Sequence, residues 1–391
     1  MNTKPLYMHR SHDVALTLVV LIYVQLAYSS SIIGVAWIDL IAKLNLSYTF
    51  VGAISVIGAV LSMISMMLGG SLVSHIGARR TILYSTPLML ISHAGLAMLP
   101  SPAVLIAVNF GWGLGFGAML VACTSVVIDW ERERRKRAID IFQASWNIAA
   151  IAGALLGGAL LSWQWTFVGL MWLAFYTLLP LWVCVFFASF PGSGIVEEAV
   201  NPLQSLAILT HYRELMILGL MMILVTFVQN IGQTWSPIYL NVLGANPLIS
   251  GAALAAFQSA TAIFRLINGV LVQKFGAKSV LFGGAFTICI SAVLLYAVTN
   301  QYIVLLAFIL MGAAIAGTQP TALSIGVRLH PTKSAAVTGG IMALGEVGFS
   351  ISTPLIGWIA DVVSLPFAMA LALPCGIAML IAVAFIPRST S

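Results

Sequence analysis

A short turn sequence occurs twice in this chain, 199 positions apart. The first copy reads Gly70-Ser-Leu-Val-Ser-His-Ile-Gly-Ala-Arg-Arg80, and the second reads Gly269-Val-Leu-Val-Gln-Lys-Phe-Gly-Ala-Lys278. Each copy lies between two long apolar segments, which identifies it as a basic hairpin joining two membrane helices. Ala154-Leu-Leu-Gly157 and Pro354-Leu-Ile-Gly357 repeat at nearly the same spacing. The chain is therefore expected to be one structural unit that has been duplicated.

The segments around the hairpins are apolar enough to lie in a bilayer. Of the 391 residues, 61% are hydrophobic and 7% are charged, whereas a soluble domain carries about 25% charged residues. A helix of about 20 apolar residues crosses the hydrocarbon core. We expect an all-α membrane protein with twelve transmembrane helices in two pseudo-symmetric bundles of six. The expected spans are 14–38, 49–71, 82–99, 103–128, 139–161, 165–190, 214–238, 249–272, 280–298, 302–327, 335–361 and 366–386.

One segment has the length and composition of a linker between the two halves. It begins with Pro191-Gly-Ser-Gly194, followed by Glu197 and Glu198. We expect an N-terminal bundle over 1–190, a cytoplasmic linker over 191–213 and a C-terminal bundle over 214–391. No stretch between the expected spans could hold a soluble catalytic or nucleotide-binding domain, which argues against an enzyme.

The distribution of basic residues gives the expected orientation. Basic residues in loops concentrate on the cytoplasmic side of a membrane protein. With both termini in the cytoplasm, fifteen of the seventeen basic residues lie on that side: Lys4, Arg10, Arg79, Arg80, Arg132, Arg134, Arg135, Lys136, Arg137, Arg213, Lys274, Lys278, Arg328, Lys333 and Arg388. The net charge of +6 is thus an orientation signal, and no nucleic-acid partner is expected.

The sequence predicts neither a metal site nor a cofactor. The four cysteines, Cys123, Cys184, Cys289 and Cys375, all fall within expected helices, and none stands in a CxxC motif. The glycine run over 111–117 lies inside an apolar helix with no preceding strand, so it is not a dinucleotide-binding loop.

Two charged residues fall well inside expected spans, where charge is costly and commonly functional. Glu346 lies about 3 Å and Arg265 about 7 Å to the cytoplasmic side of the midplane, at about 1.5 Å per residue. Glu346 is predicted to be a protonatable coupling site, with Arg265 as its counter-charge or as the anchor of a substrate carboxylate. Two alternatives stay open: a buried structural ion pair, or an Arg265 side chain that extends toward the headgroups.

Uncharged polar residues and one tryptophan complete the candidate substrate and ion-coupling site. They are Gln25, Asn109, Trp146, Asn147, Gln229, Asn230, Gln233, Gln258 and Gln319. Together they are typical of an amphipathic pocket of amides and aromatic rings. Each could instead form a hydrogen bond between helices.

The repeated hairpin resembles the signature of the major facilitator superfamily, G-x-x-x-D-[RK]-x-G-x-[RK]-[RK]. The matching residues are Gly70, Gly77, Arg79 and Arg80 in the first copy, and Gly269, Lys274, Gly276 and Lys278 in the second. Ser74 and Gln273 stand where the signature has aspartate. The resemblance covers essentially the whole chain and implies alternating access with the hairpins as gates. Gly153, Gly157 and Gly158, followed by Trp163 and Trp165, also resemble the glycine-rich fifth helix of exporters in that family.

We therefore expect a secondary active transporter of a small organic solute, amphipathic or anionic, with export favoured over uptake. The expected partners are this substrate, a coupling ion, which we take to be a proton, and membrane lipid. We expect a monomer, located in the inner membrane if the source is bacterial. The alternatives are an uptake permease for a small organic acid, a transport-inactive sensor or receptor of the same fold, and a membrane-embedded enzyme.

Overall fold

The computed structural model describes residues 6–99, 101–134, 138–190, 209–330 and 333–386. Within these ranges all regular structure is helical, and twelve stretches are long and apolar enough to cross a membrane. This confirms the expected all-α membrane protein with twelve spans. The first six spans are single helices: α1 (Leu6–Leu44), α2 (Tyr48–Ile76), α3 (Ala78–Met98), α4 (Pro102–Arg134), α5 (Ile139–Ser162) and α6 (Phe167–Phe187).

Two of the last six spans are interrupted, which the apolar pattern did not predict. The seventh consists of α8 (Arg213–Asn230), the π-helical turn η1 (Ile231–Trp235) and α9 (Ser236–Val242), and the twelfth of α14 (Leu365–Met369) and α15 (Ala372–Ala384). The others are α10 (Pro247–Phe275), α11 (Ala277–Ala297), α12 (Gln301–Leu329) and α13 (Ser334–Val362). A π-helical turn depends on backbone hydrogen bonding, so composition alone does not reveal it.

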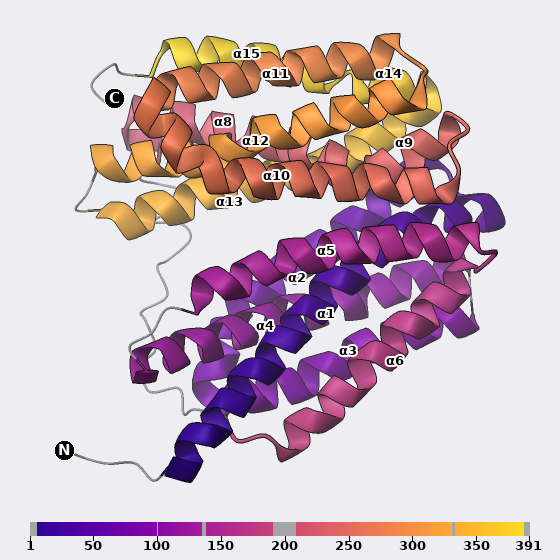
Figure 1. The fold of residues 1–391 in the computed structure, drawn as a ribbon, viewed down its shortest axis with the longest axis vertical. Coiled ribbons are helices and arrows are strands. Elements are labelled where there is room, and N and C mark those ends of the chain that lie inside the picture. The colour runs from indigo at the N-terminus through magenta and orange to yellow at the C-terminus, as the bar shows by residue number, and fades with distance from the viewer. Residues whose placement is uncertain (1–5, 100, 135–137, 191–208, 331–332, 387–391) are drawn as a thin grey trace. The chain divides into compact units, whose positions relative to one another are not determined.

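The chain divides into two compact units (Figure 1). Unit 1 comprises Met1–Leu46 and Ile54–Ala199, and unit 2 comprises Ser47–Ala53 and Val200–Ser391. The start of α2 thus belongs to unit 2, while the rest of that helix belongs to unit 1. Residues 191–208 of the expected linker lie outside the described ranges.

Close backbone contacts at glycines repeat between the units. In unit 1, a Cβ atom added at Gly113 would lie 2.6 Å from the carbonyl oxygen of Gly58. In unit 2, a Cβ atom at Gly312 would overlap the carbonyl oxygen of Phe257. Both residues of the second pair lie 199 positions after those of the first. The duplication therefore extends to the packing of α2 on α4 and of α10 on α12.

The two hairpins have the same backbone conformation. Gly77 has φ 83° and ψ 154°, and Gly276 has φ 82° and ψ 151°, a region that only glycine adopts readily. Arg79 donates from Nε to the carbonyl oxygen of Val185 (3.0 Å) and from its guanidinium to that of Phe186.

Lys278 makes the corresponding contact in unit 2. Its Nζ donates to the carbonyl oxygens of Ala384 (3.2 Å) and Ile386 (3.1 Å). A cation at the carboxyl end of a helix satisfies carbonyl groups that lack partners and complements the helix dipole. Each hairpin therefore fastens the end of the last helix in its own unit.

Alanine at Gly77 or Gly276 is expected to destabilise the protein by about 1 to 3 kcal/mol, because an L-residue at these angles is strained. Nothing lies within 4 Å of a Cβ atom added at Gly77, so the cost there is backbone strain alone. Thermal unfolding followed by tryptophan fluorescence in detergent micelles measures it. Gly70→Ala is the matched control, since Gly70 lies inside α2 with open space around it. Equal unfolding temperatures for Gly77→Ala and Gly70→Ala would contradict the strain argument.

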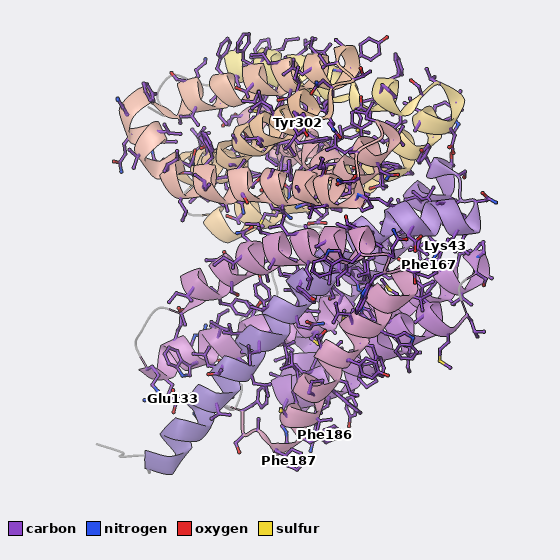
Figure 2. All side chains as sticks on the ribbon, turned by 45° about the vertical axis from the view of Figure 1, so that its right-hand side comes forward. Lys43, Glu133, Phe167, Phe186, Phe187 and Tyr302 are labelled. Atoms are coloured by element: carbon purple, nitrogen blue, oxygen red, sulfur yellow. The ribbon has the colours of Figure 1, made fainter. Side chains whose placement is uncertain are left out.

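Polar contacts fasten both ends of unit 1. At one end, Asp39 accepts a hydrogen bond from the backbone N–H of Phe167 (2.7 Å) and pairs with Lys43 (3.1 Å). Figure 2 shows Lys43 beside the ring of Phe167, with Glu133 at the opposite end of the unit. Glu133 contacts His12 there at 2.6 Å. These contacts join α1 to α6 at one end and to α4 at the other.

Candidate functional site

The two intramembrane charges lie in unit 2 and do not form an ion pair. Arg265 in α10 and Glu346 in α13 are both exposed. The guanidinium of Arg265 and the carboxylate of Glu346 do not approach within 4.0 Å of each other, nor of any other group of opposite charge among the described residues. The alternative of a buried structural ion pair is therefore wrong for this conformation.

Arg265 begins a line of hydrogen bonds across three helices. Its guanidinium donates to Oε1 of Gln319 in α12 (3.3 Å), and Nε2 of Gln319 donates to Oε1 of Gln229 in α8 (2.7 Å). These residues form what we call the polar line. The amide orientations are assigned from this network. The contact to Gln319 holds Arg265 toward α12, so the alternative in which it extends freely toward the headgroups does not describe this structure.

The polar line is rich in donors. A guanidinium offers five N–H groups and no acceptor, and each glutamine amide offers two N–H groups. Both amide oxygens of the line already accept hydrogen bonds within it. The remaining N–H groups of Arg265 and the Nε2 amide of Gln229 have no hydrogen-bond partner in the part of the chain that the structure describes. The line therefore presents donors to a ligand.

Two further candidate amides lie at the π-helical turn η1. Asn230 directly precedes the turn, and Gln233 lies within it. Asn230 is fully buried, and its Nδ2 donates to Ser352 (2.6 Å) and to the carbonyl oxygen of Phe349 (2.9 Å). Asn230 is therefore a helix contact between α8 and α13, which is the alternative considered for it. Gln233 is half-buried within η1, where π-helical turns often accompany function.

The remaining amides fall into two groups, those with a hydrogen-bond partner among the described residues and those without one. Gln25 is buried and donates to Thr177 (2.8 Å) and to the carbonyl oxygen of Ala174 (3.1 Å), so it joins α1 to α6. Asn109 donates to the carbonyl oxygen of Leu105 in its own helix (2.8 Å). Three other candidate amides make no hydrogen bond to another described residue: Asn147, Gln233 and Gln258.

An aromatic cluster in unit 1 surrounds Trp146. The Tyr23 ring stacks on Phe142 at 3.9 Å and lies 4.9 Å from Trp146. Phe116 lies 6.0 Å from Trp146 and stacks on Trp112 at 4.7 Å. Nε1 of Trp112 is buried with no hydrogen-bond partner among the described residues.

Phe116 and Phe142 were not among the predicted site residues, although both belong to this aromatic cluster. Each lies four positions from a tryptophan on the same helix: Phe116 follows Trp112 in α4, and Phe142 precedes Trp146 in α5. Residues at this spacing share a helix face, so the spacing was the signal.

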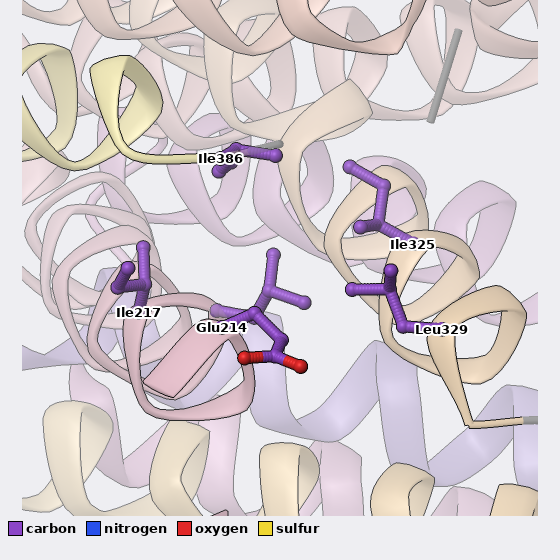
Figure 3. Close-up of a pocket in the computed structure, with 6 residues that line it drawn as sticks. Glu214, Ile217, Ile325, Leu329 and Ile386 are labelled. Atoms are coloured by element: carbon purple, nitrogen blue, oxygen red, sulfur yellow. The ribbon is translucent and has the colours of Figure 1, made fainter. Parts of the chain in front are cut away.

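The other candidate hairpin residues are at the surface. Gly70, Arg80, Gly269 and Lys274 are exposed. A narrow pocket at the hairpin end of unit 2 is lined by Glu214, Ile217, Leu218, Ile325, Leu329 and Ile386 (Figure 3). Glu214 also lies 3.4 Å from His330. This pocket is almost entirely aliphatic and contains no candidate site residue.

Comparison with known proteins identifies the family. The model of the Major Facilitator Superfamily matches residues 19–257 and 240–391. An uncharacterized transporter of Sinorhizobium fredii, y4wD, is 24% identical over 274 residues, which are 67% of this chain and 69% of that protein.

Solved structures of the same fold cover nearly the whole chain. The nucleoside transporter NupG superposes with a TM-score of 0.82 at 11% identity, over 95% of this chain and 98% of that one. A D-xylose-proton symporter superposes with a TM-score of 0.70 at 15% identity, over 96% and 97%. With its two hairpins and twelve spans, this multi-pass integral membrane protein belongs to the Major Facilitator Superfamily, a family of transporters and not of enzymes.

Proposed function

We propose that this protein is a secondary active transporter that moves a small organic anion across the membrane by alternating access. The observation that carries the proposal is the polar line Arg265–Gln319–Gln229. A cation inside a membrane span is costly and tends to be neutralised by a partner. Since no carboxylate among the described residues pairs with Arg265, the substrate supplies the negative charge.

The chemistry of the polar line favours a carboxylate over a neutral polar ligand. A carboxylate only accepts hydrogen bonds, and a guanidinium binds it through two parallel N–H groups. The free donors of Arg265 and Gln229 match such a group. A neutral alcohol or amide would leave part of the charge of Arg265 uncompensated, which is costly away from water.

The aromatic cluster of unit 1 supports a substrate with an apolar part. Trp112 and Trp146 are half-buried, and rings of this kind offer flat apolar surface with one polar N–H group. Such rings bind the aromatic or aliphatic body of an organic molecule.

Glu346 is the proposed coupling residue. It is an exposed carboxylate in the middle of α13, and no basic group among the described residues pairs with it. A carboxylate that moves between water and a low-dielectric environment takes up and releases a proton. Proton uptake at Glu346 would thus accompany each conformational change.

Further parts of the proposal concern orientation, direction and assembly. The hairpin ends of both units are cytoplasmic, because the basic residues concentrate there. The protein exports its substrate and works as a monomer in the cytoplasmic membrane, the inner membrane of a bacterium with two. Gly153 supports the resemblance to exporters, since a Cβ atom there would overlap the carbonyl oxygen of Tyr28 and the helices α1 and α5 need this close approach.

Counterflow in proteoliposomes tests the proposed function. A panel of radiolabelled organic acids, each paired with its neutral amide, is expected to show exchange of acids only. Arg265→Gln is expected to raise KM about 10- to 100-fold, the cost of losing hydrogen bonds to a charged group, and Arg265→Lys is expected to recover part of it. Arg328→Gln, which removes a charge from the last turn of α12, is the control. Equal exchange of acids and amides would refute the anion site, and no exchange by any solute would favour the sensor alternative.

A further inference from the structure

The helix α2 begins in one structural unit and continues in the other. Its first residues lie within Ser47–Ala53, which belongs to unit 2, and from Ile54 onward the helix belongs to unit 1. Yet α2 is one continuous helix from Tyr48 to Ile76. A rigid helix transmits the movement of one end to the other, so whatever holds the first turn also restrains the rest of the helix.

A carboxylate of α13 accepts the first two N–H groups of that turn. Asp361 lies next to the last residue of α13, and its two oxygens accept the backbone N–H groups of Tyr48 (3.0 Å) and Thr49 (2.7 Å). The first N–H groups of a helix have no partner within the helix, and negative charge there is favoured by the helix dipole. Ser47 caps the N–H of Phe50 from within the local sequence (3.1 Å), and Asp361 supplies, from about 310 positions away, the acceptors for the two N–H groups before it.

The backbones of α2 and α13 also meet without intervening side chains. A Cβ atom at Gly357 would overlap the carbonyl oxygen of Tyr48, and one at Gly52 would lie 2.6 Å from the carbonyl oxygen of Thr353. The Tyr48 ring meets the edge of the fully buried Trp235 at 6.1 Å. Trp235 is the last residue of η1, so the contact reaches the π-helical turn that follows the end of the polar line.

We propose that Asp361 is a gating residue, and that its contacts with the first turn of α2 form a latch. The latch comprises Asp361, Gly357 and residues Ser47–Ala53. This inference rests on the proposed alternating-access function, because the start of α2 must leave α13 whenever the end of the protein opposite the hairpins opens. The latch holds the first turn of α2 on α13 until two hydrogen bonds are broken.

Hydrogen exchange of the purified full chain in detergent measures the latch without any substrate. Asp361→Ala is expected to speed exchange of the Tyr48 and Thr49 amides roughly fivefold, the effect of losing a helix cap, and Asp361→Asn by less, since one acceptor oxygen remains. Asp39→Ala is the matched control, because Asp39 caps the N–H of Phe167 in unit 1 in the same manner. Unchanged exchange at Tyr48 and Thr49 in Asp361→Ala, or an equal increase in Asp39→Ala, would overturn the latch.

A glycine pair provides a second, independent perturbation. Gly357→Ala is expected to push the first turn of α2 away from α13 and to speed exchange at Tyr48 and Thr49, while Asp361 stays in place. Gly157→Ala, 200 positions earlier, is the control, because a Cβ atom there would make ordinary contacts of 3.5 Å with Ile32 and Val35. If the amides of Tyr48 and Thr49 exchange in Gly357→Ala as slowly as in the wild type, the close backbone approach is not part of the latch.

Cross-linking separates the latch from the proposed function. The test uses a chain with its four native cysteines replaced and with Thr49→Cys and Asp361→Cys introduced. Joining these two cysteines with a short reducible bis-thiosulfonate is expected to lower the rate of counterflow at least about tenfold, and reduction is expected to restore it. The control cross-link joins Asp39→Cys and Phe167→Cys and is expected to leave counterflow unchanged. Continued flux through the cross-linked latch would refute gating by Asp361. If Asp361→Ala speeds amide hydrogen exchange at Tyr48 and Thr49 but the protein transports no solute, the latch is retained and the proposed transport is refuted.

Discussion

Replacing Glu346 with glutamine is expected to abolish accumulation driven by a pH gradient while leaving counterflow intact. A gradient of one pH unit supports about tenfold accumulation when one proton moves with each substrate. Glutamine has the size of protonated glutamate but carries no proton that it can release. The variant can therefore change conformation with or without substrate, yet it cannot use the gradient.

The measurement compares uptake into or release from proteoliposomes with and without the pH gradient, in wild type and in Glu346→Gln. Glu214→Gln is the matched control, because Glu214 is the carboxylate of unit 2 that lies beside His330 at the hairpin end. Gradient-driven accumulation that survives in Glu346→Gln would assign coupling to another group. Loss of counterflow as well would make Glu346 a substrate-binding residue and not a coupling residue.

Gly348→Ala is expected to have the largest effect on folding. A Cβ atom at Gly348 would overlap the carbonyl oxygen of Ile223 and lie 2.5 Å from Oγ1 of Thr226. Neither backbone can yield without separating α8 from α13, which would also stretch the hydrogen bond from Thr226 to the carbonyl oxygen of Gly345 (2.7 Å). Overpacking of this kind costs about 1 to 3 kcal/mol or more.

The yield of monodisperse protein and its thermal unfolding midpoint measure this effect. Gly283→Ala is the control, since Gly283 lies within α11 and nothing is within 4 Å of a Cβ atom added there. The control is expected to be neutral or more stable by up to about 1 kcal/mol, because alanine favours helix over glycine. Similar midpoints for the two variants would show that α8 and α13 can separate without penalty.

The twelve spans and the repeated hairpins could be predicted because their signals are local. A run of apolar residues determines a span by its length, and Gly77 and Gly276 mark turns because few other residues adopt their φ. The contacts that give the hairpins their role are not local. Arg79 reaches carbonyl groups more than 100 positions away, at Val185 and Phe186, and no pattern in the hairpin indicates them.

The candidate site was predictable only in part, for the same reason. Arg265 and Glu346 were identified because charge is rare in apolar segments, but the order of helices in space decides that Arg265 meets Gln319. The nine uncharged candidates could not be separated by sequence. Gln25 and Asn147 look alike in an apolar helix, yet Gln25 bonds to Thr177 whereas Asn147 bonds to no other described residue.

The hairpin contacts of Arg79 and Lys278 have a consequence for how such a chain could arise. Each hairpin contact is made inside its own unit, with the end of α6 in unit 1 and with the end of α15 in unit 2. A shorter gene encoding six helices would already have contained every group that its hairpin needs. The two copies then differ in their charge, since Arg265 and Glu346 stand in the second half where Met66 and Trp146 stand at the matching places in the first.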